Sequence, residues 1–466
     1  MPRRKKIVEE KPKIVQPKGR GPQLLRGMKD ILPAEQKFWS LLRHEAERLA
    51  KDYGFDRIET PILEETSLFT RAVGKQTDIV EKEMFSFEDQ GKDNIALRPE
   101  ATASIVRAYT NHGMANQPQP VKLFYWGPMF RHERPQSGRQ RQFHQAGFEI
   151  LGEKHPIVDA LLILVAFNFY KDIGLGVNIQ INSLGCSICR PKYKEALTNY
   201  YRSHRSELCE DCKKRLVKNP LRLLDCKEES CQALKGEAPQ IMDWLCEECK
   251  PHFVKVLEYL EEMQVPYVLN PALVRGLDYY TKTVFEVWAE GDEGTTAQNA
   301  LGGGGRYDDL VEIMGGRSTP AAGFSLGIER SINKIKDKGV AVPDLPRPDV
   351  FLAQLGEPAK RKSIQLFEEL RKEGVGVSES FSKEGLKPQL EIANRIGAKF
   401  ALILGQKELV DGTIMIRDMD AGNQEIVDFK KIVKEVKKRL GLNGEVKPVE
   451  VEKDIAPEPE NLKLEI

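Results

Sequence analysis

The sequence predicts an α+β core, in which extended segments and helices alternate, followed by a small α/β domain. Residues 123–152 form two extended runs joined by a hydrophilic, glycine-containing loop, which is the pattern of a β-hairpin. Residues 348–440 alternate apolar strand-like runs with helical periodicity, which is typical of an α/β domain. Between them, residues 171–268 form a polar block that holds all eight cysteines and interrupts the core. At 466 residues the chain is long enough for two or three domains.

The N-terminal elements follow from charge and apolar spacing. Residues 1–20 carry eight Lys or Arg against two Glu, so we expect residues 1–22 to be a disordered basic tail. A helix is predicted over about residues 34–53, where apolar side chains recur at helical spacing and Gly54 provides a stop. Pro61 favours a strand edge or a bend in the extended piece that follows.

The second run of the hairpin alternates with a period of two residues. Ala146, Phe148 and Ile150 share a face that resembles core, whereas Gln145 and Glu149 share the other face. The polar face also carries Phe143, and the loop and opposing run supply several arginines. Guanidinium, carboxylate and aromatic groups on one face suit a ligand with phosphate, a hydrogen-bonding ring and a positive charge. A solvated charge run on an exposed hairpin is the alternative interpretation.

Three further segments carry candidate site residues. Residues 97–104 place Glu100 and Thr102 at the expected end of a strand, where both can face one pocket. Residues 273–287 place a cluster of polar and aromatic side chains just before a β-branched strand. The glycine run at 302–305, taken alone, is interpreted as a structural turn, and it matches neither the P-loop pattern nor the dinucleotide-binding fingerprint.

Composition excludes some functional classes. The net charge is +1, so any nucleic-acid site must be a local one. The most apolar stretch, residues 160–169, is too short to cross a membrane, and the N-terminus has no secretory signal. Cysteines confined to residues 186–249 favour a reducing cytoplasm over a disulfide-linked secreted protein. Residues 445–466 carry seven acidic residues, three lysines and three prolines, which predicts a disordered acidic tail.

Over about residues 25–440 the chain resembles the class II aminoacyl-tRNA synthetases, and among them the histidyl-tRNA synthetase family. The segment around Pro61 resembles the dimer-forming first motif of that class, residues 130–150 the second and GFSLGIER the third. LVRGLDYYTKTVFEV and GGGGRYD resemble the two motifs that are specific to histidine. The resemblance implies a class II core, made of an antiparallel sheet flanked by helices, with an inserted domain and a C-terminal α/β anticodon-binding domain.

This resemblance also implies domain boundaries. The core would comprise 23–170 and 269–338, interrupted by the cysteine-containing insertion 171–268. A linker at 339–347 would lead to the anticodon-binding domain at 348–440 and then to the acidic tail at 441–466.

The resemblance implies roles for individual residues. Arg275 and Arg131 would be catalytic, because guanidinium groups can stabilise charge at the α-phosphate. The histidine-binding residues would be Glu100, Thr102, Gln145, Glu149, Arg275, Tyr279, Tyr280 and Tyr307. The ATP-binding residues would be Arg131, Glu133, Arg139, Phe143 and Arg330. Arg134 and Gln136 in the hairpin loop would meet the tRNA acceptor stem.

The implied reaction uses ATP with Mg²⁺ to activate L-histidine and then transfers the histidyl group to tRNA(His). The implied protein is a cytoplasmic homodimer with no membrane partner. One alternative is the non-catalytic regulatory subunit of ATP phosphoribosyltransferase, which shares the fold but typically loses catalytic motifs and the anticodon-binding domain. Here the motif arginines and the C-terminal domain are both present. A second alternative, an unrelated ATP-dependent ligase, requires the histidine-specific motifs to be accidental.

The cysteines have metal-ligand spacing. They form the pairs Cys186-x₂-Cys189, Cys209-x₂-Cys212, Cys226-x₄-Cys231 and Cys246-x₂-Cys249. Such pairs can build one or two tetrahedral Cys₄ sites for structural Zn²⁺, although the sequence does not show which pairs combine. Free buried cysteines are the alternative.

Overall fold

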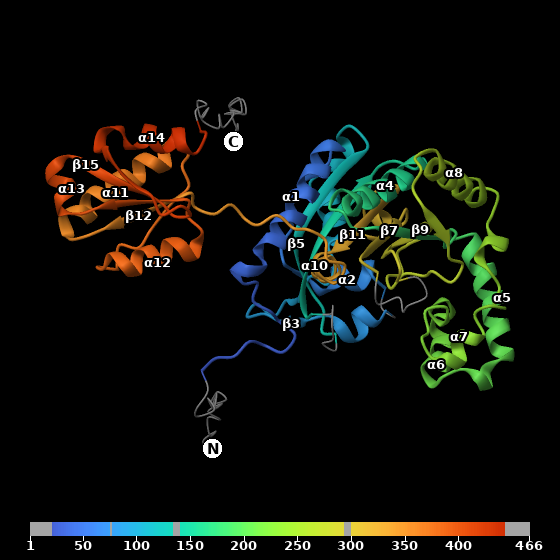
Figure 1. The fold of residues 1–466 in the computed structure, drawn as a ribbon. Coiled ribbons are helices and arrows are strands. Elements are labelled where there is room, and N and C mark those ends of the chain that lie inside the picture. The colour runs from blue at the N-terminus through green and yellow to red at the C-terminus, as the bar shows by residue number, and fades with distance from the viewer. Residues whose placement is uncertain (1–20, 75–76, 134–139, 293–299, 443–466) are drawn as a thin grey trace, which may run out of the picture. The chain divides into compact units, whose positions relative to one another are not determined.

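The predicted hairpin forms strands β5 and β6 of a large sheet in the first part of the chain (Figure 1). The computed structural model describes residues 21–74, 77–133, 140–292 and 300–442. Within these residues the sheet has eight strands in the order β1 (Asp56–Arg57), β5 (Val121–Phe130), β6 (Gln142–Leu151), β11 (Ala321–Gly327), β10 (Gly302–Arg306), β9 (Thr281–Ala289), β7 (Val177–Ser183) and β8 (Tyr267–Leu269). Its central strands pair antiparallel, and only the short edge strands β1 and β8 pair parallel to their neighbours.

Helices cover both faces of this sheet, as the implied fold class requires (Figure 1). On one face lie α1 (Gln36–Asp52), α4 (Ile157–Asp172), α8 (Cys249–Glu262) and α10 (Ile328–Asp337). On the other face lie α2 (Thr66–Ala72), α3 (Thr102–Asn111) and α9 (Leu310–Ile313), beside a small sheet of β2 (Leu63–Glu65), β4 (Asn94–Leu97) and β3 (Ser86–Glu88). Single helical turns occur at Pro33–Glu35, Ile79–Glu83, Met114–Asn116, Arg205–Glu207, Pro220–Leu223, Ile241–Trp244 and Phe429–Lys431.

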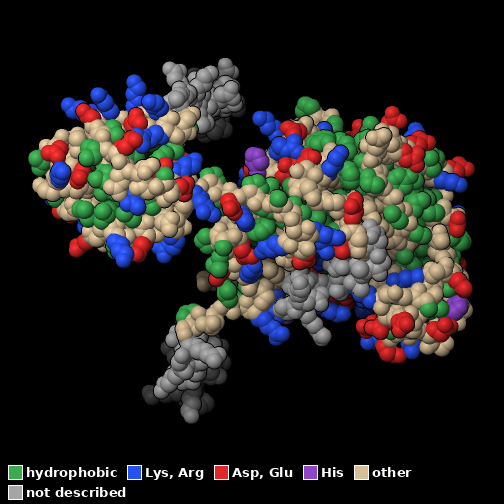
Figure 2. Space-filling model, viewed as in Figure 1, with side chains coloured by type: hydrophobic (Ala, Val, Ile, Leu, Met, Phe, Trp, Pro, Cys, Tyr) green, Lys and Arg blue, Asp and Glu red, His purple; other side chains and the backbone are tan. Residues whose placement is uncertain are grey.

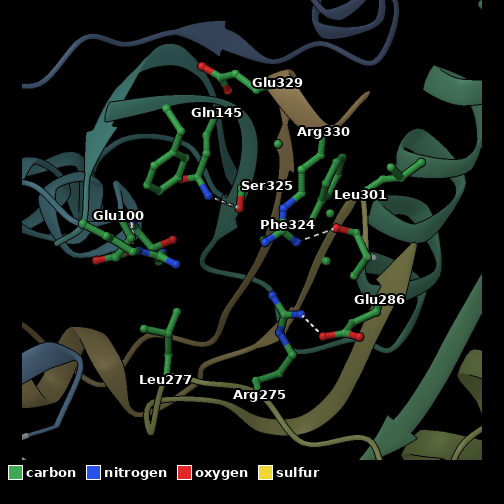
Figure 3. A pocket seen from close by; sticks show the side chains of 18 of the residues that line it. Glu100, Gln145, Arg275, Leu277, Glu286, Leu301, Phe324, Ser325, Glu329 and Arg330 are labelled. Atoms are coloured by element: carbon green, nitrogen blue, oxygen red, sulfur yellow. Dashed lines mark hydrogen bonds and ion pairs between the residues drawn. The ribbon is translucent and has the colours of Figure 1, made fainter. Parts of the chain in front are cut away.

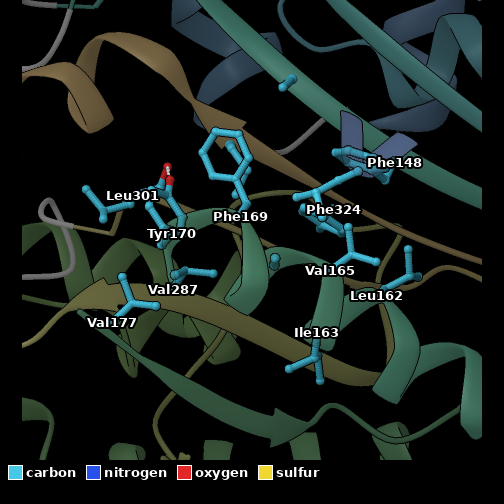
Figure 4. Close-up of a cluster of buried hydrophobic side chains, with 14 of the residues drawn as sticks. Phe148, Leu162, Ile163, Val165, Phe169, Tyr170, Val177, Val287, Leu301 and Phe324 are labelled. Atoms are coloured by element: carbon cyan, nitrogen blue, oxygen red, sulfur yellow. Dashed lines mark hydrogen bonds between the residues drawn. The ribbon is translucent and has the colours of Figure 1, made fainter. Parts of the chain in front are cut away.

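The most apolar stretch of the sequence forms the middle of α4, which packs between the sheet and helices α1 and α8. Its side chains meet the core face of the hairpin (Figure 4), where Phe148 of β6 stacks on Phe324 of β11 with ring centroids 5.1 Å apart. Ala146, Phe148 and Ile150 are fully buried here, which confirms the predicted core face of the hairpin. Among the described helices, none combines the length and the apolar character needed to cross a membrane.

The cysteine-containing block supplies strands as well as an insertion. Its ends form β7 and β8 of the core sheet. The predicted boundaries at 171 and 268 therefore assign β7 and most of β8 to the insertion, although both strands belong to the core. The insertion itself carries α5 (Cys189–Ser203), α6 (Glu210–Lys218) and α7 (Glu229–Ala233), which lie beyond the sheet in Figure 1. Although the block is polar, these helices bury an apolar cluster of their own, which includes Tyr193, Leu197 and Tyr201.

Residues from Asp344 onward form a second compact unit. Its described residues contain a five-stranded sheet in the order β13 (Val377–Glu379), β12 (Val350–Gln354), β14 (Phe400–Leu404), β15 (Thr413–Asp418) and β16 (Gln424–Asp428). Helices α11 (Glu357–Lys372), α13 (Gln406–Asp411) and α14 (Ile432–Arg439) pack on one face and α12 (Leu386–Ile396) on the other. The predicted α/β alternation is confirmed. The two predicted tails lie almost wholly outside the described residues.

Candidate active site

A cavity of about 190 Å³ opens on the polar face of the hairpin, beside the glycine-rich strand β10 (Figure 3). Of the predicted site residues, its lining includes Glu100, Thr102, Arg131, Glu133, Phe143, Gln145, Arg275, Tyr279, Tyr280 and Arg330. Segments separated by more than two hundred residues therefore meet at one place. Three other predicted residues, Arg134, Gln136 and Arg139, lie outside the described residues.

Glu100 lies at the beginning of helix α3 rather than at the end of a strand. β4 ends at Leu97 and α3 begins at Thr102. The Glu100 carboxylate accepts hydrogen bonds from the backbone N–H groups of Thr102, at 2.7 Å, and Ala103, at 3.0 Å. Burial raises the pKa of Glu100, and these two N–H donors act in the opposite direction. The Glu100 carboxylate is therefore held in a fixed orientation, because backbone N–H groups in the first turn of the helix bind both of its oxygens.

Glu149 and Tyr307 lie one layer behind the cavity, because neither is among the residues that line it. The hydroxyls of Thr102 and Tyr307 donate to the two carboxylate oxygens of Glu149 at 2.9 and 2.5 Å. Since Thr102 itself lines the cavity, Glu149 is one hydrogen bond away from it. Burial raises the pKa of Glu149 to about 8, so a proton is bound there in much of the neutral pH range.

Two glycines make room for this buried layer. A Cβ atom on Gly323 would lie 1.5 Å from Oε2 of Glu149, and a Cβ atom on Gly147 would lie 2.1 Å from the ring of Tyr125. The sequence assigned no function to either glycine, although Gly147 shares the polar face of the hairpin with Gln145 and Glu149. Only the cross-strand register, in which Gly323 of β11 pairs with Glu149 of β6, shows why a side chain is excluded.

Arg275 is held by a carboxylate that the sequence reasoning missed. Its Nη1 donates to Oε1 of Glu286 at 2.6 Å (Figure 3). Its guanidinium lies 5.6 Å from the ring centre of Tyr280. Trp288 Nε1 donates to the other Glu286 oxygen at 3.2 Å. The available signal was a carboxylate within the apolar end of strand β9, between Phe285 and Val287, where burial requires a polar partner.

The remaining arginines approach from other elements. Arg131 follows β5, its Nε donates to the Pro99 carbonyl at 2.9 Å, and its guanidinium lies 5.2 Å from the ring centre of Phe143. Arg330 lies in the first turn of α10 and donates to the Ala300 carbonyl at 2.9 Å. Figure 3 shows Arg330 and Arg275 pointing toward one another from opposite sides of the cavity. The cavity therefore collects three guanidinium groups, which suits a ligand with several negative oxygens.

The glycine run forms strand β10, which corrects its interpretation as a turn. Gly302 and Gly303 line the cavity, and a Cβ atom on Gly303 would lie 2.7 Å from Nη1 of Arg275. A Cβ atom on Gly304 would lie 2.1 Å from the Gly323 carbonyl oxygen in the neighbouring strand. The glycines thus allow close packing of three strands at the cavity floor.

Two polar groups around the cavity, Ser325 and Glu329, were given no role from the sequence. The predicted Gln145 donates through its side-chain amide to Ser325 at 3.2 Å, while its buried Oε1 has no hydrogen-bond partner among the described residues. Glu329 accepts from the His144 backbone N–H at 2.9 Å, which joins α10 to the hairpin. An acceptor without a partner in a cavity suits a ligand donor such as an ammonium group.

The eight cysteines come together outside this cavity in two groups. One contains Cys186, Cys189, Cys246 and Cys249, and the other contains Cys209, Cys212, Cys226 and Cys231. Within each group all four sulfur atoms lie within 4.8 Å of one another. The structure therefore supplies the pairing that spacing alone left open.

Comparison with known proteins agrees with this geometry. A family profile described as histidyl-tRNA synthetase matches residues 27–330, and one described as an anticodon binding domain matches residues 349–439. A protein of Dehalococcoides mccartyi strain 195, named histidine–tRNA ligase, is 47% identical over 416 residues, covering 89% of this chain and 99% of that protein.

Solved structures give the same picture. The apo histidyl-tRNA synthetase of S. aureus superposes with a TM-score of 0.75 at 35% identity, covering 90% of this chain and all of that one. A Bacillus halodurans structure, titled as an ATP phosphoribosyltransferase regulatory subunit/histidyl-tRNA synthetase, superposes with a TM-score of 0.58 at 22% identity over 81% of this chain and 96% of that one. At that identity the second likeness concerns the fold alone.

Proposed function

The chain belongs to the histidyl-tRNA synthetase family, and from that premise we propose that it attaches L-histidine to tRNA(His) through a histidyl-adenylate formed from ATP. The observation that carries this proposal is the cavity itself. Its lining combines carboxylate and amide acceptors, Glu100 and Gln145 among them, with three arginines. The ammonium group of an amino acid needs hydrogen-bond acceptors, and a polyphosphate beside it needs positively charged groups.

Histidine would occupy the end of the cavity near α3. Its ammonium group would donate to Glu100, to Thr102 and to the unpartnered Oε1 of Gln145. Its imidazole would lie against Tyr279 and Tyr280, toward the layer formed by Glu149 and Tyr307. Reaching Glu149 requires the ligand to displace or share the Thr102 hydrogen bond, because that bond now occupies one oxygen.

ATP would occupy the end lined by Arg131, Phe143 and Arg330. The adenine would stack on Phe143, whose ring now lies beside the Arg131 guanidinium, and Glu133 would accept from the adenine amino group. Arg131 and Arg330 would hold phosphate oxygens, together with Arg139 of the hairpin loop. Arg275 would lie between the two ligands and contact both the histidine carboxylate and the α-phosphate.

In the first step a histidine carboxylate oxygen attacks the α-phosphorus, the bond to the β-phosphate oxygen breaks and pyrophosphate leaves. In the second step a terminal ribose hydroxyl of the tRNA attacks the histidyl carbonyl and AMP leaves. No side chain serves as a covalent nucleophile in this scheme. Arg131 and Arg275 lower the barrier by positioning the reactants and by stabilising the charge that grows on the α-phosphate.

Mg²⁺ would accompany ATP in this site. The lining carboxylates of Glu286 and Glu329 already have protein partners, since Glu286 binds Arg275 and Trp288 and Glu329 binds His144. The ion would therefore be held mainly by phosphate oxygens, and when bound it would neutralise their charge. Zn²⁺ is the second ion that the sequence predicts, and its candidate ligands lie in the insertion.

The second unit, from Asp344, would bind the tRNA anticodon, and Arg134 and Gln136 would meet the acceptor stem. Figure 2 shows Lys and Arg side chains gathered on the α14 side of this unit. Lys434 of α14 and the preceding Lys430 and Lys431 are exposed. We further propose a cytoplasmic homodimer. It would bury the exposed apolar side chains of Ile62, Leu63 and Phe87 at the small sheet near Pro61.

ATP–pyrophosphate exchange with each of the twenty amino acids tests this function. We expect exchange that depends on histidine, and histidylation of tRNA when tRNA(His) is added. Absence of exchange with every amino acid would favour the regulatory-subunit alternative, and exchange with a different amino acid would refute the histidine pocket.

A further inference from the structure

We propose that the insertion holds two structural zinc ions with separate roles, one where the insertion joins the core and one within its far end. We name the first group, Cys186, Cys189, Cys246 and Cys249, the root site. We name the second group, Cys209, Cys212, Cys226 and Cys231, the tip site. Each group offers four thiol sulfurs and no histidine, carboxylate or open ligand position, which is the donor set of a structural rather than a catalytic zinc site.

The sulfur spacing fits a single tetrahedral ion. Four thiolates about 2.3 Å from one zinc ion stand about 3.8 Å from each other. In the root site Sγ of Cys186 lies 3.7 Å from that of Cys189 and 3.9 Å from that of Cys246. In the tip site Sγ of Cys209 lies 3.8 Å from that of Cys226. A disulfide would require sulfurs about 2.05 Å apart, and an iron–sulfur cluster places its cysteines around several metal atoms rather than one.

Backbone N–H groups already point at these sulfurs. In the root site the N–H groups of Ile188 and Cys246 donate to Sγ of Cys186 and Cys189 at 3.4 and 3.1 Å. In the tip site the N–H groups of Cys212 and Cys209 donate to Sγ of Cys209 and Cys231, at 3.4 and 3.3 Å. Four thiolates around one Zn²⁺ carry a net charge of −2, and N–H donors offset that charge.

The root site joins the two ends of the insertion. Cys186 and Cys189 follow β7 directly, whereas Cys246 and Cys249 lead into α8, which returns the chain to the core. An ion bound by both pairs would cross-link residues about sixty positions apart at the point where the insertion leaves the sheet. The cross-link would thereby restrict how the insertion moves relative to the core.

The root site is also next to the wall of the active-site cavity. Arg190, the residue after Cys189, donates to the carbonyl of Tyr280 at 2.5 Å and to that of Gly185 at 3.4 Å. Gly185, the residue before Cys186, accepts from the Lys282 backbone N–H at 2.9 Å. Tyr280 lines the cavity that would receive histidine. An ion at the root site would therefore hold the Tyr280 segment in place through Arg190, which acts here as a positioning residue.

The tip site has a different environment. Cys212, Cys226 and Cys231 belong to the apolar cluster of the insertion, together with Leu216 and Leu223. Among the described residues, the hydrogen bonds of these four cysteines stay within residues 209–235. An ion there would hold α6 and α7 together and stabilise the insertion, without a direct link to the cavity.

Metal analysis of the full chain, purified without chelator, gives the first test. We expect two zinc ions per chain. The double variants Cys189→Ser/Cys249→Ser and Cys212→Ser/Cys226→Ser should each retain one ion. Ser187→Ala and Ser206→Ala, which change exposed neighbours of each site, should retain both. No zinc with eight titratable thiols, iron in place of zinc, or one ion shared by all eight cysteines would overturn the proposal.

A second test separates the two roles. The root variant should raise the KM for histidine in pyrophosphate exchange about tenfold or more, with a smaller change in the KM for ATP. The tip variant should exchange near the wild-type rate but lose heat stability. Equal effects of both variants on the histidine KM would contradict a positioning role for the root site. If either variant fails to fold, Co²⁺ is substituted for Zn²⁺ in the wild-type chain. We expect spectra of tetrahedral Co²⁺ bound by four thiolates at both sites. Absence of such spectra would refute the sites.

Discussion

Arg275 depends on Glu286 for its direction. The 2.6 Å ion pair fixes one guanidinium nitrogen, and Trp288 fixes the carboxylate in turn. Burial of Glu286 raises its pKa, and the nearby Arg275 charge opposes this rise. The Arg275 guanidinium can therefore be buried at the cavity, because the Glu286 carboxylate compensates its positive charge. Because its buried Nε has no hydrogen-bond partner within the described part of the chain, Arg275 retains capacity to bind a ligand.

Replacing Arg275 by Ala is expected to reduce histidine-dependent pyrophosphate exchange on the order of 10²–10³-fold. The reason is the loss of a preorganised positive charge at the position where negative charge grows. Exchange kinetics with saturating ATP and histidine measure this loss. Arg361→Ala, which removes an exposed arginine of the second unit, is the control, and near wild-type exchange by the Arg275 variant would contradict the catalytic role.

Replacing Glu149 by Gln is expected to raise the KM for histidine more than the KM for ATP. An amide retains one acceptor for Tyr307 or Thr102 but always keeps its N–H donors, whereas the Glu149 carboxyl group can give up its proton and accept from the imidazole. Steady-state exchange with each substrate varied in turn distinguishes the two constants. Equal changes in both constants would remove Glu149 from the histidine pocket.

The same substitution is expected to change how stability depends on pH. The pKa of Glu149 is about 8 in the folded chain, above its ordinary value of 4.5, so the folded state holds a proton that the unfolded state loses in this window. Stability contributed by this group is therefore present below pH 4.5 and is lost as the pH rises toward 8.

Glu149→Gln removes that loss, so its free energy of unfolding should rise relative to wild type between pH 5 and pH 8, by at most about 5 kcal/mol. Urea denaturation at pH 5, 6.5 and 8 measures the difference. Glu312→Gln, at an exposed carboxylate, should show no such trend. A difference that is constant across the three pH values would show that Glu149 does not hold this proton.

At the scale of elements, β10 shows why four consecutive glycines form a strand. Glycine is usually unfavourable inside a strand, because it buries no side chain and loses more conformational entropy on folding. Here the strands on both sides approach so closely that a Cβ atom on Gly304 would overlap the Gly323 carbonyl oxygen and one on Gly305 the Thr283 carbonyl oxygen. Close packing of β9, β10 and β11 therefore decides the conformation.

Gly304→Ala is expected to destabilise the first unit by roughly 3 kcal/mol or more, because the added methyl group meets backbone atoms that cannot move aside independently. Thermal unfolding measured by circular dichroism tests this. Gly236→Ala is the control, since a Cβ atom at Gly236 meets nothing within 4 Å. Equal stability of both variants would mean that the sheet adjusts to the methyl group.

At the scale of the whole molecule, the chain separates reaction and recognition into two units. Every described residue that lines the cavity lies before Pro343, whereas the unit from Asp344 has its own sheet and its own apolar clusters. The first unit therefore contains every described residue that we assign to adenylation.

Ending the chain at Pro343 is expected to reduce tRNA charging at least tenfold while preserving most histidine-dependent pyrophosphate exchange. The physical reason is that the exposed lysines of α14, which would attract tRNA phosphates, are removed, whereas the cavity is retained. Aminoacylation and exchange assays on the same preparation measure both activities. Reversing charge at Lys430, Lys431 and Lys434 in the full chain should weaken charging similarly without truncation. Undiminished charging by both proteins would refute a tRNA-binding role for this unit.

Sequence alone determined the features that depend on local periodicity and on motifs. The alternation of β6, the helix α1 and the order of elements in the second unit follow from apolar spacing, which acts along the chain. The family followed from motifs at five separate places, and the comparisons confirm it. The roles given to single site residues remain predictions, including those of Arg134, Gln136 and Arg139 outside the described residues.

Only the tertiary structure decided which distant groups meet. The partnership of Arg275 with Glu286, the position of Glu149 behind Thr102 and the division of eight cysteines into two groups all depend on strand register and helix packing. These contacts join residues on different elements, and their distances arise from packing rather than from spacing in the chain. The glycine run is the clearest case: its own propensity favours a turn, and the neighbouring strands make it a strand.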